Sequence, residues 1–221
     1  KDKEGHRWCI VMSHESHNHP SQIVPYEGAA TGVGGNVRDV LCMGAKVIAC
    51  SDSLRFGDIK SNKTQWIHDG VVSGIAGYGN PIGVPNIGGD LYYNNGYNEN
   101  CLVTLVTLGI VREDNIIHSY APKNAKNYDL ILIGKPTDNS GFGGASFASL
   151  ELEEEKKEKN KGAVQEPNAF LERHLLKSTY ALFEILKKEN LIDKVGFKDL
   201  GAGGIACASV ELAETSGYGA E

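Results

Sequence analysis

The sequence lacks the short motifs that identify most nucleotide-binding and metal-binding chains. It has no G-x-x-x-x-G-K-[ST], and no G-x-G-x-x-G after an apolar run, which excludes a P-loop and a dinucleotide-binding fingerprint. Its five cysteines are scattered, with no C-x-x-C. A disulfide framework or a cysteine zinc site is therefore not expected, and a reducing, cytoplasmic environment is.

Positive charge is also scarce. The 221 residues include 22 Lys and Arg against 28 Asp and Glu, a net charge of −6. Nucleic-acid-binding chains usually carry an excess of positive charge, so that class is not expected. No apolar run is as long as a membrane span, and the most apolar stretch, residues 102–111, has the length of a strand. Glycine, by contrast, is abundant, with 27 residues that cluster beside apolar runs.

The spacing of apolar residues predicts an α/β chain. Strands are expected at residues 8–13, 46–51, 101–111 and 128–133. Helices are expected at residues 29–43, 64–78, 170–188 and 204–215. The apolar face of helix 170–188 is predicted to consist of Leu171, Leu175, Leu182, Ile185 and Leu186.

A polar stretch that contains Pro122 predicts a domain boundary. We expect a first domain at residues 1–115, a linker at 116–127 and the first part of a second domain at 128–221. Residues 151–161, dense in Glu and Lys, are interpreted as an exposed loop or frayed helix. The sequence begins at Lys1 without an initiator Met and stops soon after the last expected helix, so we interpret it as a fragment.

The most informative stretch directly follows the first expected strand. It reads Ser-His-Glu-Ser-His-Asn-His-Pro, from Ser13 to Pro20. Proline opposes helix continuation and keeps the residue before it extended, so Glu15, His17 and His19 are predicted to share one face. Zinc is the weaker interpretation, because no H-E-x-x-H is present. A phosphate and Mg²⁺ site, with histidine for proton transfer, is the stronger one.

Two glycine-rich segments accompany further carboxylates. Residues 28–35, Gly-Ala-Ala-Thr-Gly-Val-Gly-Gly, are predicted to begin a helix whose free N–H groups attract anions. Arg38 could then pair with a phosphate, or form an ordinary surface pair with a carboxylate. Asp39 could hold Mg²⁺. Asp199, followed by Gly-Ala-Gly-Gly, repeats the arrangement, which predicts one site built between two domains.

These residues resemble the phosphoribosylformylglycinamidine synthases, also called formylglycinamide ribonucleotide amidotransferases. The resemblance is carried by Glu-Ser-His-Asn-His-Pro-Ser, Pro-Tyr, Gly-Ala-Ala-Thr-Gly-Val-Gly-Gly and Arg-Asp between residues 15 and 39. It continues in Gly-Gly-Ala-Ser-Phe-Ala-Ser at 143–149 and in residues 199–211. Ser16 and Ser21 are similar to the synthetase subunit of the stand-alone small type.

The resemblance implies the aminoimidazole ribonucleotide synthetase fold, classed as α/β (α+β). Its N-terminal domain, whose sheets assemble into a barrel, is followed here by the start of the C-terminal-type domain. The implied activity is that of an ATP-dependent ligase of purine biosynthesis, which converts formylglycinamide ribonucleotide and ammonia from glutamine into the amidine. Mg²⁺ and ATP are the implied cofactors. A glutaminase subunit and a small accessory subunit are the implied partners, with no nucleic acid and no membrane.

The resemblance also implies roles for individual residues. The implied Mg²⁺ ligands are Glu15, Asp39 and Asp199. The implied catalytic proton acceptor is His17. The implied substrate-binding residues are Ser16, His17, Asn18, His19, Arg38 and Gln165.

Three departures from the family pattern leave alternatives open. Ser13 stands where the family usually has an ATP-contacting Lys, Asp90 stands where Glu is more common, and the connection from Gln165 to Asp199 is longer than usual. The alternatives are another ATP-dependent enzyme of the superfamily and a non-catalytic Mg²⁺-nucleotide-binding module. Because an upstream histidine region and the second half of the family's chain are missing, the fragment alone is expected to be inactive.

Overall fold

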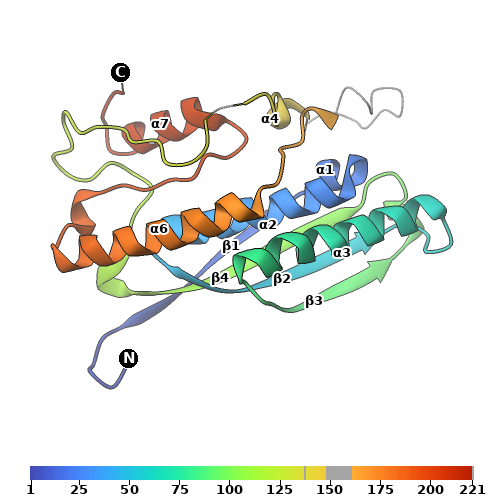
Figure 1. The fold of residues 1–221 in the computed structure, drawn as a ribbon, viewed down its shortest axis with the longest axis horizontal. Coiled ribbons are helices and arrows are strands. Elements are labelled where there is room, and N and C mark those ends of the chain that lie inside the picture. The colour runs from blue at the N-terminus through green and yellow to red at the C-terminus, as the bar shows by residue number, and fades with distance from the viewer. Residues whose placement is uncertain (137, 148–160, 221) are drawn as a thin grey trace.

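The structure, a computed structural model, describes residues 1–136, 138–147 and 161–220. Figure 1 shows a sheet beneath a layer of helices, with further helices and extended chain above them. The strands of the sheet are β1 (Trp8–Ser16), β2 (Lys46–Phe56), β3 (Asn86–Tyr93) and β4 (Leu102–Arg112). The α-helices are α1 (Asn18–Ile23), α2 (Pro25–Cys42), α3 (Asn62–Ile82), α4 (Gly144–Phe147), α6 (Ala169–Lys188) and α7 (Gly204–Glu214). The short 3₁₀ helices are η1 (Asn95–Tyr97), η2 (Glu113–Asn115) and η4 (Ile192–Lys194).

The strand order is β1-β4-β2-β3. β4 pairs antiparallel with both β1 and β2, whereas β2 and β3 are parallel. Parallel strands need a crossover connection, and α3 supplies it. The helix ends at Gly83, whose φ of 76° is left-handed, a conformation that glycine adopts without a steric penalty.

Alternation along β4 explains why the helices cover one face of the sheet. Val103 and Leu105 are buried against the helices, whereas the residues between them are only partly covered. Leu54 and Phe56 of β2 join the same core. Figure 1 shows α2, α3 and α6 on this one side. On β1, the opposite side exposes Ile10 and Met12.

Helix α6 packs against α3 and α2, so the predicted second domain contributes to the core of the first. Its buried residues are Glu172, Leu176, Thr179, Phe183 and Leu186. Of the predicted apolar face, Leu186 is buried in the core and Leu182 packs against it partly buried, whereas Ile185 is exposed. Positions 172, 176, 179 and 183 follow the helical repeat. Because the first of them is a glutamate, the sequence did not reveal this series as the buried face.

Several expected elements are confirmed, with bounds that differ by up to five residues at one end. The expected strands at 8–13, 46–51 and 101–111 correspond to β1, β2 and β4, and the four expected helices correspond to α2, α3, α6 and α7. The expected strand at 128–133 is wrong, because these residues pair with no strand and Ile131 is exposed. A strand alone is not stable, since its backbone needs a partner. Helix α1 and strand β3 were missed.

The remaining expectations concern the segment outside the sheet. Residues 151–160 of the charged segment, like residues 148 and 149 of the glycine-rich match, lie outside the described residues. The predicted domain boundaries at 115 and 128 stay a prediction. None of the helices in the described ranges is long and apolar enough to cross a membrane.

Candidate active site along one face of helix α2

Strand β1 presents two polar side chains to the helical layer. Ser13 donates from Oγ to Oδ2 of Asp39 at 2.8 Å, and Asn36 donates from Nδ2 to Ser13 Oγ at 3.2 Å. Glu15, two residues further along the strand, lies beside Gly35, where an added Cβ would come 3.6 Å from Glu15 Oε2. The period of two along β1 therefore aims Ser13 and Glu15 at α2.

Three carboxylates gather here: Glu15 from β1, Asp39 from α2 and Asp199 from the segment before α7. We call them the carboxylate cluster. Burial and the nearby charge of Asp39 raise the pKa of Glu15 to about 7. Burial and Asp39 likewise raise the pKa of Asp199 to about 6. Asp39 and Asp199 both raise the pKa of Glu15, so the three predicted metal ligands are brought together.

The cluster is looser than a closed metal cage. In the described part of the chain, the only group with three ligand atoms mutually within 4.8 Å is Asp2, Glu4 and His6 at the exposed N-terminal segment. Mg²⁺ is commonly held by one or two carboxylates and retained waters, so the spacing of the carboxylate cluster is compatible with that ion. A local turn holds together Asp2, Glu4 and His6, which had not been identified as candidates from the sequence.

Arg38 lies next to the cluster but is already paired. Its Nη1 donates to Oε2 of Glu172 at 3.0 Å, and its Nε is 3.9 Å from Oδ2 of Asp199. The hydroxyl of Tyr78 donates to the same glutamate oxygen at 3.5 Å. Burial opposes the charge of Arg38, yet Glu172 beside it raises the guanidinium pKa. The pairing partner is thus a buried carboxylate of α6 and not an ordinary surface residue.

His17 is fixed by the backbone of α2. Its Nδ1 donates to the carbonyl oxygen of Gly28, and since a carbonyl can only accept, Nδ1 carries the proton and Nε2 is left as an acceptor. Burial lowers the pKa of His17, which favours the neutral ring. An added Cβ on Gly32 would come 3.0 Å from His17 Cβ. The geometry suits a proton acceptor.

The expectation that His19 shares a face with Glu15 and His17 was wrong. The chain enters α1 at Asn18, directly after His17, and a proline in the first turn of a helix is tolerated because its missing N–H is not needed there. The ring of His19 instead lies edge-to-face with Phe147 of α4, with centroids 6.0 Å apart.

The other predicted substrate residues are placed differently. Ser16 is exposed at the end of β1, opposite Thr104. Asn18 accepts a hydrogen bond from the Val103 N–H at 2.8 Å, which is a structural role. The Gln165 carbonyl accepts from Thr31 Oγ1 at 3.2 Å, so this residue does reach α2.

The predicted anion site at residues 28–35 was also wrong. Helix α2 begins at Pro25, so these residues lie inside the helix, where the N–H groups are used by intrahelical bonds. Their glycines serve close packing. An added Cβ on Gly28 would overlap the backbone of Pro20 and Ser21, and one on Gly34 would come 2.8 Å from Tyr78 Cζ. By contrast, α7 does begin in the glycine-rich segment after Asp199.

Residues 28, 32, 35 and 39 follow the repeat of a helix and form one face of α2. His17 lies against Gly28 and Gly32, Glu15 lies against Gly35, and Asp39 completes the series.

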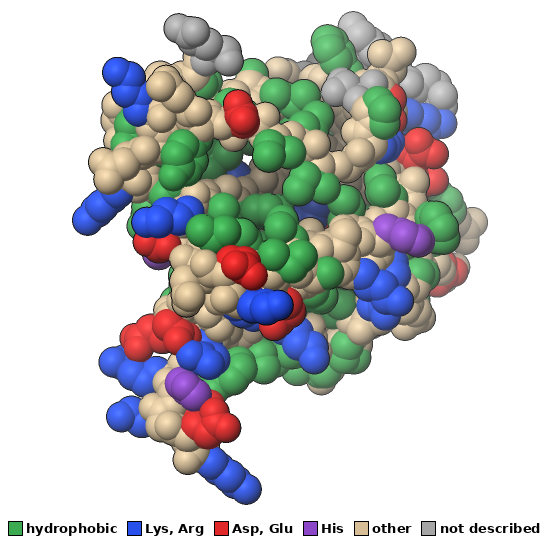
Figure 2. Space-filling model, turned by 60° about the vertical axis from the view of Figure 1, so that its left-hand side comes forward, with side chains coloured by type: hydrophobic (Ala, Val, Ile, Leu, Met, Phe, Trp, Pro, Cys, Tyr) green, Lys and Arg blue, Asp and Glu red, His purple; other side chains and the backbone are tan. Residues whose placement is uncertain are grey.

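Figure 2 shows the molecule hollowed between the upper layer, which contains α7, and the body below. Sequence reasoning missed Glu172, Tyr78 and Asn36, whose signal was only a polar residue at a buried helical position.

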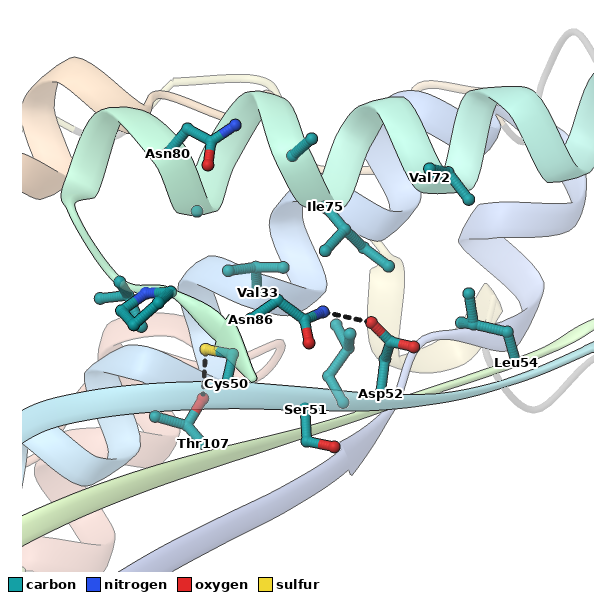
Figure 3. Close-up of a pocket in the computed structure, with 15 residues that line it drawn as sticks. Val33, Cys50, Ser51, Asp52, Leu54, Val72, Ile75, Asn80, Asn86 and Thr107 are labelled. Atoms are coloured by element: carbon teal, nitrogen blue, oxygen red, sulfur yellow. Dashed lines mark hydrogen bonds between the residues drawn. The ribbon is translucent and has the colours of Figure 1, made fainter. Parts of the chain in front are cut away.

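A separate cavity of about 460 Å³ lies between α3 and strands β2 and β3. Figure 3 shows Asp52 pointing into it, with Asn86 donating to its carboxylate, and Cys50 beside Thr107. Burial raises the pKa of Asp52. The cavity lies on the β2–β3 side of the sheet, whereas the carboxylate cluster lies at the β1 edge. It is therefore distinct from the candidate active site.

Two family models and several known proteins match this chain. The family model described as AIR synthase related protein, N-terminal domain, matches residues 3–111, and the corresponding C-terminal domain model matches residues 129–221. A curated relative, phosphoribosylformylglycinamidine synthase subunit PurL from Methanothrix thermoacetophila, is 54% identical over 97% of this chain and 28% of its own length.

Two solved structures of PurL from Thermotoga maritima are also similar. The complex with FGAR has a TM-score of 0.77 and 38% identity, covering 94% of this chain and 32% of that one. The complex with ATP has a TM-score of 0.71 and 34% identity, covering 97% and 32%. The chain thus spans about 28% of the length of the curated relative it matches. Because the two domain models together cover most of its residues, the chain belongs to the family of AIR synthase related proteins.

Proposed function

We propose that the natural protein containing this chain is the synthetase that converts formylglycinamide ribonucleotide into formylglycinamidine ribonucleotide in purine biosynthesis. ATP and ammonia derived from glutamine are the other substrates. The observation that carries the proposal is the gathering of Glu15, Asp39 and Asp199 beside the face of α2 that holds His17. Similarity to PurL structures complexed with FGAR and with ATP supports it.

The carboxylate cluster fits Mg²⁺. Burial and mutual repulsion raise the pKa values of Glu15 and Asp199, so a cation placed among these carboxylates would relieve an existing electrostatic cost. Arg38 opposes this rise at both carboxylates, but it does not cancel it. Glu15, Asp39 and Asp199 would hold the ion, which when bound neutralises charge on the triphosphate.

In the proposed reaction the γ-phosphoryl group passes from ATP to the amide oxygen of the ribonucleotide, and ADP is released. The nitrogen of ammonia then bonds to the carbon that carries this phosphorylated oxygen. The bond between that carbon and the oxygen breaks, and phosphate leaves. The nitrogen must also lose a proton. His17 is the proposed acceptor, because Nδ1 is committed to Gly28 and Nε2 has no hydrogen-bond partner among the residues that the structure describes.

Substrate contacts are proposed for residues around this face of α2. Ser16 directly precedes His17, His19 follows it by two residues, and the Gln165 carbonyl is hydrogen-bonded to Thr31 of α2. Arg38 is proposed to contact substrate through the guanidinium N–H groups that Glu172 does not use. Asn18 is proposed to contribute through its side-chain amide nitrogen, since its oxygen binds Val103.

A glutaminase subunit and a small accessory subunit are the proposed partners, because free ammonia must be generated from glutamine and delivered to the site. The cytoplasmic location expected from the unpaired cysteines stays a prediction. Among the described residues all five cysteines are free.

The proposal is tested by measuring ADP release by the natural full-length protein with Mg²⁺-ATP and ammonium, with and without formylglycinamide ribonucleotide. ADP release that depends on the ribonucleotide is the expected result. ATP binding with no ribonucleotide-dependent ADP release would contradict the proposed function.

One observation favours a second candidate, a non-catalytic Mg²⁺-nucleotide-binding module. Ser13 occupies the position of the family's usual Lys, and its hydroxyl is committed to Asp39. Such a module would bind Mg²⁺-ATP and gain thermal stability from it, yet show no turnover with any ribonucleotide. The same ADP measurement, run beside a thermal unfolding assay, separates the two candidates.

A further inference from the structure

Glu172 is a buried acid on α6 whose partners lie on other helices. Its side chain is 2% exposed, and Oε2 accepts from Arg38 of α2 at 3.0 Å and from Tyr78 of α3 at 3.5 Å. Its other oxygen, Oε1, is buried and has no hydrogen-bond partner within the described ranges of the chain. Glu172 therefore joins three helices through one carboxylate oxygen.

Packing alone does not explain this carboxylate. A buried ion pair loses the hydration of both charges, and replacing such a pair by apolar residues of similar volume is often neutral or stabilising. The neighbours along the same stripe of α6 are uncharged: Leu176 and Phe183 belong to the hydrophobic core, and Thr179 is buried between them. A leucine at position 172 would suit that stripe, so the charge of Glu172 calls for another reason.

The partner of Glu172 indicates that reason. Arg38 precedes Asp39 in the chain, its Nε is 3.9 Å from Asp199, and its Nη2 lies near Gly35. An added Cβ on Gly35 would come 3.8 Å from that Nη2 and 3.6 Å from Glu15 Oε2. The guanidinium therefore lies beside Asp199 and near Glu15, while its Nη1 is bound by Glu172.

We propose that Glu172 is a positioning residue, which holds Arg38 at the border of the carboxylate cluster and keeps the guanidinium from occupying the cation position. This inference rests on the proposed function, since it concerns the Mg²⁺ of that site. Arg38 is already within ion-pair distance of Asp199, and without its anchor the guanidinium moves in between Asp199 and Glu15 and competes with the divalent cation. Residues that orient the direct surroundings of a metal change its affinity about 10–100-fold when substituted.

The test compares Glu172→Gln with wild type in the natural full-length protein. The Mg²⁺ concentration for half-maximal thermal stabilisation is measured, with Mn²⁺ titration calorimetry as a second readout. We expect at least a ~10-fold increase in that concentration for Glu172→Gln. The matched control is Glu184→Gln on the same helix, an exposed residue paired with Lys187, which should leave it unchanged.

A second pair of variants separates positioning from simple loss of charge. If Glu172 acts by holding Arg38, Glu172→Gln has no further effect on Mg²⁺ affinity in an Arg38→Met background. An equal effect in both backgrounds would overturn the inference, as would unchanged Mg²⁺ affinity of Glu172→Gln. If Glu172→Gln does not fold, Glu172→Asp is used. It keeps the charge but retracts it, so weakened Mg²⁺ binding supports the inference and wild-type binding overturns it.

Failure of the proposed function looks different. A wild-type protein that shows no response to Mg²⁺ or Mn²⁺ would overturn both the metal site and the inference. A wild type that binds Mg²⁺ and a Glu172→Gln variant that binds it equally would overturn the inference alone.

Discussion

Arg38 on α2 and Glu172 on α6 form an ion pair, 3.0 Å from Nη1 to Oε2, although 134 positions separate them in the sequence. Arg38 lies in the segment matched by the N-terminal domain model, and Glu172 lies in the segment matched by the C-terminal one. Asp199, from the second segment, likewise lies near Asp39 from the first, whose charge raises its pKa. The proposed cation site is therefore complete only when both segments are packed together.

The first prediction concerns pH in the absence of metal. The pKa of Glu15 is raised from 4.5 to about 7 in the folded state. A raised carboxyl pKa contributes stability that is fully present below the unfolded value and is lost as pH rises through the folded value. We expect wild type to lose unfolding free energy relative to Glu15→Gln between pH 4.5 and about 7, measured by denaturant unfolding in EDTA.

Mg²⁺ should reverse the order of stability of wild type and Glu15→Gln. At pH 8 the carboxylate is ionised and free to bind the ion, so excess Mg²⁺ should stabilise wild type more than Glu15→Gln. Parallel pH curves for the two proteins, or equal Mg²⁺ stabilisation, would contradict a carboxylate cluster that awaits a cation.

The sequence predicted where most helices and strands lie better than it predicted the contacts between them. Alternation in β4 and the stretch from Ser13 to His17 were informative, because the direction in which a strand side chain points follows a local period of two. The missed strand β3 contains Gly88 and Gly89 and is exposed along most of its length, so no apolar pattern marks it. Whether it is a strand depends on pairing with β2, which is a tertiary contact.

The glycines of α2 were misinterpreted for a similar reason. Glycine weakens helices in isolation by about 1 kcal/mol relative to alanine, so a cluster at residues 28–35 was placed at a helix end. The reason for the glycines is contact with α1, α3 and β4, which no local pattern reveals. Glu172 was hidden likewise, since a carboxylate on a buried stripe makes sense only beside Arg38.

The second prediction tests this packing role with a matched pair of substitutions. In Gly28→Ala the new methyl would overlap the backbone of Pro20 and Ser21, which cannot move as a side-chain end can, and we expect a loss of about 3 kcal/mol. In Gly35→Ala the methyl meets only ordinary contacts, and helix propensity favours a gain of about 0.5–1 kcal/mol. Chemical unfolding in EDTA measures both. Equal destabilisation would indicate that the glycines are not there for close packing.

The third prediction concerns His17. Replacing it by alanine should reduce kcat by about 10²–10⁴-fold, the usual contribution of a positioned acid or base, while Mg²⁺-ATP binding is kept. The control is His14→Ala, because His14 lies on β1 three residues before His17 and is exposed. Ribonucleotide-dependent ADP release measures kcat in the full-length protein. A loss of the same size in both variants would argue against a role as proton acceptor.

The fourth prediction concerns Ser13, whose hydroxyl donates to Asp39 Oδ2 at 2.8 Å. Ser13→Lys should strengthen ATP binding about 10-fold or more, because a hydrogen bond to a charged group contributes about 1.5–3 kcal/mol. It should also cost about 1 kcal/mol of unfolding free energy, since the bond to Asp39 is lost and Asn36 keeps fewer partners. Ser13→Met, similar in length but uncharged, is the control, and titration calorimetry with Mg²⁺-ATP is the measurement.

If lysine and methionine at position 13 change ATP affinity equally, position 13 does not face the nucleotide. If lysine alone strengthens binding and wild type turns over the ribonucleotide, the serine is a tolerated variation in an active synthetase. If lysine strengthens binding but wild type shows no turnover, the serine marks a module that binds Mg²⁺-ATP without the chemistry.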